Sequence, residues 1–280
     1  MNTRLPNPPP RHQDTKKDIW RIKKRPKILI RLILLTSGVF FLGGCSWLNE
    51  KPQPRLVMFV GVDISGSFLP KPVFDDSMAF LARYLYAHLN GLGGSEIPNT
   101  LFVGSLGGAK AGQPKAFYPI ETFQNKSVEE IEAKLREIFP KKKIDKWTDY
   151  NAFLEQVAET VRNRNMVLKP ISVVMVSDGM IDVPGKSGRH DYRGIDLYPL
   201  EKLSRNITLR LLYTSPEVGK KWESLIPRRR VKVWTEDAEV MVTWKDPKIF
   251  IPDQPMEKQD KFLHWVKDNV DFGVRMKRVD

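Results

Sequence analysis

The chain has 280 residues, 41% of them hydrophobic, which is enough for one well-packed core. Its net charge of +13 is unevenly spread, because residues 1–44 hold ten Lys and Arg against two Asp and Glu, and residues 45–280 hold 36 against 31. The triplets at 141–143 and 228–230 are isolated, so we interpret them as solvated loop charges and expect no nucleic-acid partner. The single cysteine, Cys45, excludes an internal disulfide.

Residues 21–45 have the layout of a secretory signal. Arg21–Arg31 is strongly cationic, Leu32–Leu42 is mainly apolar, and two glycines separate it from Cys45. The apolar part is short for a spanning helix, which needs about 20 residues. Because the basic end should stay in the cytoplasm, we expect everything after Trp47 to lie outside it.

Leu42-Gly43-Gly44-Cys45 resembles the lipobox of bacterial lipoproteins, in which the signal is cut before a cysteine that carries diacylglycerol. The resemblance implies lipidation of Cys45 and a membrane-anchored protein of the cell envelope. Ser46 favours the outer membrane if the source is Gram-negative. The alternative is an uncleaved anchor from Ile28 to Trp47. We take residues 1–44 as leader and signal segment, and residues 45–55 as a tether.

Strands and helices alternate along the rest of the chain. Continuous apolar runs predict buried strands, and amphipathic runs predict helices. We expect strands at Leu56–Val62, Leu101–Leu106, Ala116–Glu121, Ile171–Val176, Ile207–Tyr213 and Val231–Trp234. We expect helices at Val73–Leu89, Val128–Phe139, Tyr150–Asn163, Ser215–Ile226 and Phe262–Val270.

This order predicts a doubly wound α/β fold, with a mainly parallel central sheet and helices on both faces. The segment at 116–121 is expected to be an antiparallel edge strand. We place one domain at residues 56–245. Residues 246–280 are expected to form a connection, loosely packed over Asp246–Lys258, and a C-terminal helix.

Polar side chains stand where predicted strands end. Asp63, Ser65 and Ser67 follow the first strand, and Asp178 follows the strand at 171–176. Thr148 directly precedes a predicted helix. Because ligands of open α/β sheets bind outside the carboxyl ends of the strands, we expect these five side chains to converge on one point.

The five residues resemble the metal-ion-dependent adhesion site (MIDAS) of von Willebrand factor type A (vWA) domains. That family has Asp-x-Ser-x-Ser after its first strand, a Thr in a distant loop and an Asp after its fourth strand, and the likeness extends over about Leu56 to Trp234. The resemblance implies a Rossmann-like vWA fold. It also implies a divalent cation held by Ser65, Ser67 and Thr148, with Asp63 and Asp178 holding coordinated waters.

Mg²⁺ suits such a set, because it prefers six oxygen ligands in octahedral geometry; Mn²⁺ and Ca²⁺ are alternatives. A cation with few direct carboxylates stays electrophilic and can accept an acidic side chain. We therefore expect a membrane-tethered, extracytoplasmic binding module that engages an exposed Asp or Glu of a protein partner.

Structural roles for the same residues stay open. Asp63 and Ser67 could satisfy loop amides. Thr148 could cap the following helix, with Asp149 as its first-turn charge. Asp178 and the glycine after it could form an ordinary turn.

Two other functions also stay open: a metal-dependent hydrolase that uses Asp63, and a cation-independent envelope scaffold. We do not expect an enzyme, because the motif contains no His or Lys to act as general acid or base. The second Asp of the acid phosphatase pattern is replaced by Ser65. His190 and Asp191 lie in a long loop that is expected to border the metal face, where they could help to select the ligand.

Overall fold

The structure is a computed structural model that describes residues 53–70, 72–108, 116–141, 147–181 and 191–271. The leader, Cys45, most of the tether and His190 lie outside these ranges. No helix within them is long and apolar enough to cross a lipid bilayer. The signal segment and the lipidation of Cys45 therefore stay predictions.

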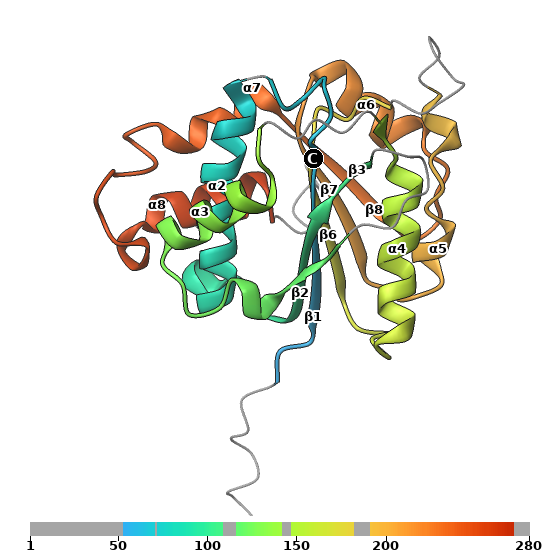
Figure 1. The fold of residues 1–280 in the computed structure, drawn as a ribbon, viewed down its shortest axis with the longest axis horizontal. Coiled ribbons are helices and arrows are strands. Elements are labelled where there is room, and N and C mark those ends of the chain that lie inside the picture. Colours follow the sequence, from blue (N-terminus) through green and yellow to red (C-terminus); the bar gives the residue numbers. More distant parts are fainter. Residues whose placement is uncertain (1–52, 71, 109–115, 142–146, 182–190, 272–280) are drawn as a thin grey trace, which may run out of the picture. The chain divides into compact units, whose positions relative to one another are not determined.

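The described residues form a central six-stranded sheet in the order β4-β2-β1-β6-β7-β8 (Figure 1). All neighbouring pairs are parallel except β4 with β2, which is antiparallel. The predicted mainly parallel sheet with one antiparallel edge strand is confirmed. The strands are β1 Leu56–Val62, β2 Pro98–Ser105, β4 Tyr118–Pro119, β6 Ile171–Val176, β7 Ile207–Thr214 and β8 Lys232–Asp237.

Helices cover both faces of this sheet, with α2, α3 and α8 on one face and α4, α5 and α6 on the other (Figure 1). The helices are α2 Pro72–Asn90, α3 Val128–Ile138, α4 Tyr150–Asn163, α5 Tyr198–Glu201, α6 Pro216–Leu225, α7 Ala238–Met241 and α8 Asp260–Asn269. The described 3₁₀ turns are η2 Leu92–Gly94, η3 Ile120–Thr122, η4 Tyr192–Gly194, η5 Val242–Lys245 and η6 Met256–Lys258.

Alternate residues of β1 enter two separate cores. Met58 and Val60 pack in the core beneath α2, whereas Val57 and Phe59 pack in the core beneath α4. All four side chains are almost completely buried. A strand buried on both faces needs a continuous apolar run, which is the pattern that predicted β1.

The connection before α8 is packed more closely than we expected. The ring of Phe250 lies edge-on to Trp244 and Phe262, with ring centroids 5.4 and 5.6 Å away. Met256 is buried, and the buried side chain of Gln259 bonds to the backbone of Ile251. These contacts come from residues isolated among prolines and charges, so hydrophobic periodicity could not predict them.

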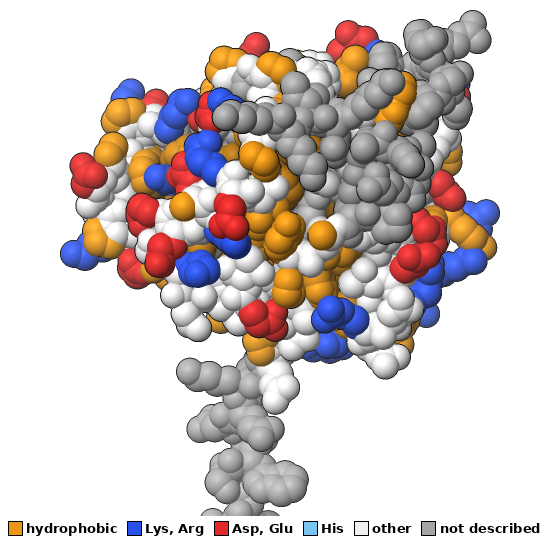
Figure 2. Space-filling model, viewed as in Figure 1, with side chains coloured by type: hydrophobic (Ala, Val, Ile, Leu, Met, Phe, Trp, Pro, Cys, Tyr) orange, Lys and Arg blue, Asp and Glu red, His pale blue; other side chains and the backbone are white. Residues whose placement is uncertain are grey.

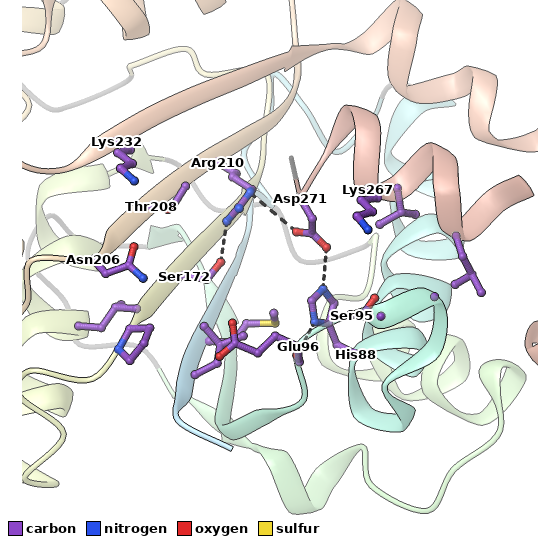
Figure 3. A pocket seen from close by; sticks show the side chains of 18 residues that line it. His88, Ser95, Glu96, Ser172, Asn206, Thr208, Arg210, Lys232, Lys267 and Asp271 are labelled. Atoms are coloured by element: carbon purple, nitrogen blue, oxygen red, sulfur yellow. Dashed lines mark hydrogen bonds and ion pairs between the residues drawn. The ribbon is translucent and has the colours of Figure 1, made fainter. Parts of the chain in front are cut away.

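A charged cluster joins the chain just after α8 to the sheet and to α2 (Figure 3). Asp271 Oδ2 lies 2.9 Å from His88 Nε2, and Arg210 donates from Nη1 to Ser172 Oγ at 2.9 Å. Burial opposes the charged forms, but Asp271 raises the pKa of His88 and His88 lowers the pKa of Asp271. The cluster therefore holds opposite charges together at the end of the sheet where the parallel strands begin.

Candidate metal centre

Asp63 lies directly after β1, at the carboxyl edge of the sheet. Its N–H donates to Val176 O of β6 at 2.9 Å, and its side chain is completely buried. Oδ1 accepts from Ser65 N at 2.8 Å and has a long contact of 3.5 Å with Thr148 Oγ1. Oδ2 accepts from Ser177 Oγ at 2.5 Å. Three segments that are distant in the sequence thus meet at one carboxylate.

Ser65 and Ser67 lie in the turn that follows. Their Oγ atoms are 3.1 Å apart, with Ser65 buried and Ser67 exposed. The turn is fixed by the N–H of Leu69, which donates to Ser65 O at 3.0 Å. The turn therefore presents two neutral oxygens beside the buried Asp63.

Thr148 reaches this point through a short ribbon that the sequence did not predict. Strand β3 (Gly107–Gly108) pairs antiparallel with β5 (Trp147–Thr148), with Gly107 opposite Thr148. The N–H of Leu106 donates to Val62 O at 2.9 Å, which ties the ribbon to the end of β1. The ribbon thereby holds Thr148 beside Asp63.

Thr148 does not cap α4. Asp149 occupies the cap position, and its side chain accepts from Ala152 N at 3.0 Å. The alternative that Thr148 serves as the helix cap is therefore wrong, and its buried hydroxyl is oriented toward Asp63 instead.

Gly61 permits this close approach. A Cβ at this position would lie 2.3 Å from Leu106 Cδ2 and 2.8 Å from the ring of Phe153 in α4. Any larger residue would force the side chains of Leu106 and Phe153 to move, and so would disturb the packing beside Thr148.

Ser177 and Tyr150 are site residues whose roles the sequence did not show. Ser177 is fully buried at the end of β6; its Oγ donates to Asp63 and lies 2.7 Å from Tyr150 OH. Tyr150, the first residue of α4, is buried too. Neither the order Ser-Asp-Gly nor a Tyr at a helix start indicates that these hydroxyls face each other.

Asp178 follows Ser177 and is 8% exposed. Its Oδ1 accepts from Met180 N at 3.1 Å, so the local turn that we considered does form. Gly179 has a φ of +75°, and a Cβ there would lie 2.7 Å from Val218. The turn needs glycine, and it keeps Asp178 near Asp63.

The electrostatics of the site favour a cation. Burial raises the pKa of Asp63 to about 6, against hydrogen bonds from Ser177 and the Ser65 amide that lower it, and Asp178 raises it further. Burial is also the main cause that brings the pKa of Tyr192 to about 12, with Asp178 adding to the increase. Asp178 thus adds a second negative charge close to the buried carboxylate of Asp63.

The donor set also limits the choice of metal. In the part of the chain that the structure describes, no group of three or more His, Cys, Asp and Glu could hold a metal ion. A metal at this edge would therefore depend on the hydroxyls of Ser65, Ser67 and Thr148. Hydroxyls and carboxylates are hard oxygen donors, which suit Mg²⁺, Mn²⁺ and Ca²⁺. The residues fit such an ion, and their ligation of it stays a prediction.

Asp191 lies at the start of η4. Its side chain accepts from Arg193 N at 3.1 Å, a capping contact within its own loop. The next residue, Tyr192, is buried with its ring 6.5 Å from that of Trp222, and its pKa responds to Asp178. The end of this loop therefore lies near the site, whereas a role for Asp191 in ligand selection stays a prediction.

Comparisons with protein-family models and with curated proteins found no match. Among solved structures, the chain is similar to proximal thread matrix protein 1 (PTMP1) from the mussel byssus, with 15% identity, a TM-score of 0.42, and 68% of this chain and 46% of that chain covered. Another PTMP1 structure, described as having a zinc-occupied MIDAS motif, has 13% identity, a TM-score of 0.36, and 75% and 46% covered.

The pilus adhesin SpaC from Lactobacillus rhamnosus GG has 10% identity and a TM-score of 0.44, with 71% of this chain and 30% of that chain covered. Human COPII-coat protein Sec24c has 10% identity and a TM-score of 0.42, with 71% and 33% covered. The chain spans less than half the length of each of these proteins. At these TM-scores the likeness carries no argument, so the conclusions rest on the sheet order and on the contacts around Asp63.

Proposed function

We propose that the domain is a vWA-type binding module with a MIDAS. Ser65, Ser67 and Thr148 would hold Mg²⁺, with Mn²⁺ and Ca²⁺ as alternatives, while Asp63 and Asp178 act through water. The observation that carries the proposal is the fully buried carboxylate of Asp63, whose described hydrogen-bond partners are hydroxyls and an amide. A buried carboxylate is stabilised by a positive charge close by.

A bound cation would supply a Lewis-acidic position that takes an acidic side chain as ligand. The partner would therefore be a protein with an exposed Asp or Glu. In this proposal the domain is extracytoplasmic and is tethered to the membrane through a lipid on Cys45, or through an uncleaved leader, in the cell envelope. In a Gram-negative cell the outer membrane is favoured.

We favour binding over hydrolysis because of burial. Asp63 has no exposed surface, so it cannot reach a substrate as nucleophile or base without opening of the turn. The hydroxyl of Tyr150 contacts Ser177, which in turn bonds to Asp63. The pKa of Tyr150 lies well above its usual value because Tyr150 is buried and lies near Asp63. Such a phenol is a poor proton donor near neutral pH.

Thermal unfolding with Mg²⁺, Mn²⁺, Ca²⁺ or EDTA tests the metal. A specific ion at a hundred times its dissociation constant should stabilise the folded chain by about 2.7 kcal/mol. Ser67→Ala should reduce this gain, whereas Ser95→Ala, in the loop before β2, should keep it. Equal curves with every ion and with EDTA would rule out the site.

Cross-linked capture from cell envelopes, with and without EDTA, tests the partner. We expect a captured protein that is lost with EDTA and with Asp63→Ala. Capture that both changes leave intact would favour the cation-independent scaffold.

A phosphatase assay tests the hydrolase, because turnover abolished by Asp63→Ala would favour it.

A further inference from the structure

The loops that precede the parallel strands meet at one edge of the sheet, opposite the candidate metal centre. These loops are residues 53–55, 91–97, 164–170, 202–206 and 226–231. Together with the first residue of β8 they carry nine Lys and Arg but only one acid, Glu96. We call this surface the basic edge; its cations are Arg55, Arg164, Lys169, Lys202, Arg205, Arg228, Arg229, Arg230 and Lys232.

The side chains of five of these cations are exposed and form no ion pair with another described residue: Arg55, Arg205, Arg229, Arg230 and Lys232. Glu201, at the end of α5, accepts from Arg229 N and from Arg230 N, and its charge also lies near Arg229. In Figure 2, Lys and Arg side chains lie along the lower right, with some Asp and Glu beside them, toward the side where the chain enters β1 in Figure 1. The positive charge of this edge is therefore mostly uncompensated.

Exposed apolar side chains lie among these cations. Five large hydrophobic residues of the described chain are exposed, and three of them are in these loops: Ile97 at 43%, Val167 at 43% and Leu168 at 75%. Leu168 has a φ of +72°, and its N–H donates to Leu203 O at 2.8 Å. The backbone thus holds a fully apolar side chain out of the core, in a conformation that is uncommon for leucine.

A pocket of about 320 Å³ opens at the same edge, between the strand starts and α8 (Figure 3). Lys232, Lys267 and Arg210 line it, together with the carboxylates of Glu96 and Asp271. Because Asp271 is paired with His88 and lies near Arg210, the pocket is positive on balance. It offers space beside cations for a phosphate-bearing headgroup.

The chain enters the domain at this edge. Residues 53–55 are exposed, and Arg55 directly precedes β1. An anchor on the preceding segment would therefore hold the basic edge near the membrane, and not the metal edge. Here the inference rests on the membrane tether of the proposed function, but it does not depend on the metal.

We propose that the basic edge docks onto an anionic lipid surface. Its free cations would face the headgroups, and Ile97, Val167 and Leu168 would enter the interface between headgroups and acyl chains. A nucleic acid would match the charge but would leave these apolar side chains without a partner, so the combination favours a membrane. Docked in this way, the domain would turn Asp63 and its hydroxyls away from the bilayer.

A fluorescent label on the full chain tests the proposal. In a Cys45→Ser background, Val167→Cys carries a polarity-sensitive dye, and Glu239→Cys carries it at the opposite edge as the control. Both proteins are mixed with vesicles of phosphatidylcholine alone, or of phosphatidylcholine and phosphatidylglycerol in equal parts. We expect a blue shift only for position 167, only with phosphatidylglycerol, and weaker in high salt because exposed charges are screened.

Charge variants complete the test. Arg205→Gln, Arg229→Gln and Arg230→Gln together should return the emission at position 167 to its value on neutral vesicles. Lys220→Gln, Lys258→Gln and Lys261→Gln, which remove the same charge from exposed sites elsewhere, should not. Circular dichroism confirms that each variant is folded.

The same emission on both vesicle types overturns the proposal, and so does a shift produced by an oligonucleotide but not by vesicles. Failure of the metal proposal would appear as equal unfolding curves with and without EDTA, and would leave the vesicle result unchanged. The two failures can therefore be told apart.

Discussion

The two edges of the sheet carry opposite charges, and they differ even more in how those charges are satisfied. At the carboxyl edge, Asp63 and Asp178 are buried and accept hydrogen bonds, and Asp75 and Asp76 are paired. At the basic edge, the side chains of four exposed arginines and one exposed lysine form no ion pair with a described residue. Helix dipoles favour acids at one edge and bases at the other, which accounts for the signs of the charges. They do not account for the unpaired cations.

Charges at these two edges therefore have different consequences, because one set is buried and paired and the other is exposed and unpaired among the described residues. A buried charge that is paired within the domain is explained by the fold itself. An exposed group of like charges repels itself, and a partner of opposite charge reduces this repulsion. Changes at the carboxyl edge should therefore alter folding, whereas changes to the exposed, unpaired cations of the basic edge should not. Four experiments test this difference.

The largest effect is expected at Asp76. Its carboxylate accepts from Tyr213 OH at 2.9 Å, Trp244 Nε1 at 3.1 Å and Lys245 Nζ at 2.8 Å. Asp76→Ala would leave the buried phenol and indole donors unpaired, at a cost of about 2–5 kcal/mol in urea unfolding.

Asp75→Ala is the matched control, since the half-exposed Asp75 pairs with Arg136 and Lys141 at the surface. It should cost less than about 1 kcal/mol. Equal losses for Asp75→Ala and Asp76→Ala would show that burial does not separate these two acids.

Asp63→Asn should stabilise the chain when metal is absent. The folded pKa of about 6 lies above the ordinary 3.8, so ionising Asp63 costs the folded state free energy at neutral pH. Removing the charge should raise the free energy of unfolding in EDTA by about 1–3 kcal/mol, measured by urea unfolding. The same variant should lose the gain from Mg²⁺. A loss of stability in EDTA would contradict this account of the site.

Stability should depend on pH through the pair formed by His88 and Asp271. The pKa of His88 is raised, so its contribution is complete below pH 6.5 and is lost as pH rises through the folded pKa. The pKa of Asp271 is lowered, so its contribution is present above about pH 3.8 and is lost as pH falls through the folded pKa. Stability measured against pH should therefore decline on both sides of this window.

His88→Gln should flatten the alkaline side of that curve. Gln lacks the titrating group, but it keeps donors that can bond to Asp271. An alkaline decline of the same size in His88→Gln would assign it to another group.

The smallest effects should come from the basic edge. Each of Arg205→Gln, Arg229→Gln and Arg230→Gln should change the free energy of unfolding by less than about 0.5 kcal/mol, because these side chains are exposed. A loss of more than about 1 kcal/mol would mean that the arginines stabilise the fold, so that both edges contribute to folding.

Local patterns predicted most of the fold. The strands β1 and β6 and the helix α4 have the predicted ends. The two strands are continuous apolar runs and the helix has a regular amphipathic period, and both patterns can be recognised in the sequence. The ribbon of β3 and β5 could not be predicted, since each strand has two residues and one strand is Gly107–Gly108. Its register depends on tertiary contacts that leave no periodicity.

The sequence predicted the candidate metal ligands, but it did not predict the neighbouring residues that hold Asp63 in place. A family resemblance singled out Asp63 and Thr148, and the topology brings them together. Ser177 and Tyr150 support Asp63 through contacts between distant segments, which no spacing encodes. The same limit made Arg228–Arg230 seem isolated, because Arg55 and Arg205 join them only once the sheet has formed.

The position of β1 has a mechanical consequence. This seven-residue strand runs directly from the tether at Arg55 to the turn at Asp63, a span of about 23 Å. A pull between an anchored leader and a partner held at the metal centre would travel along its backbone. Because β2 pairs in parallel with all of β1 and β6 pairs in parallel with Val57–Val62, the load would shear two hydrogen-bonded ladders at once instead of opening them bond by bond. The domain would then bear tension through one of the two central strands of its sheet.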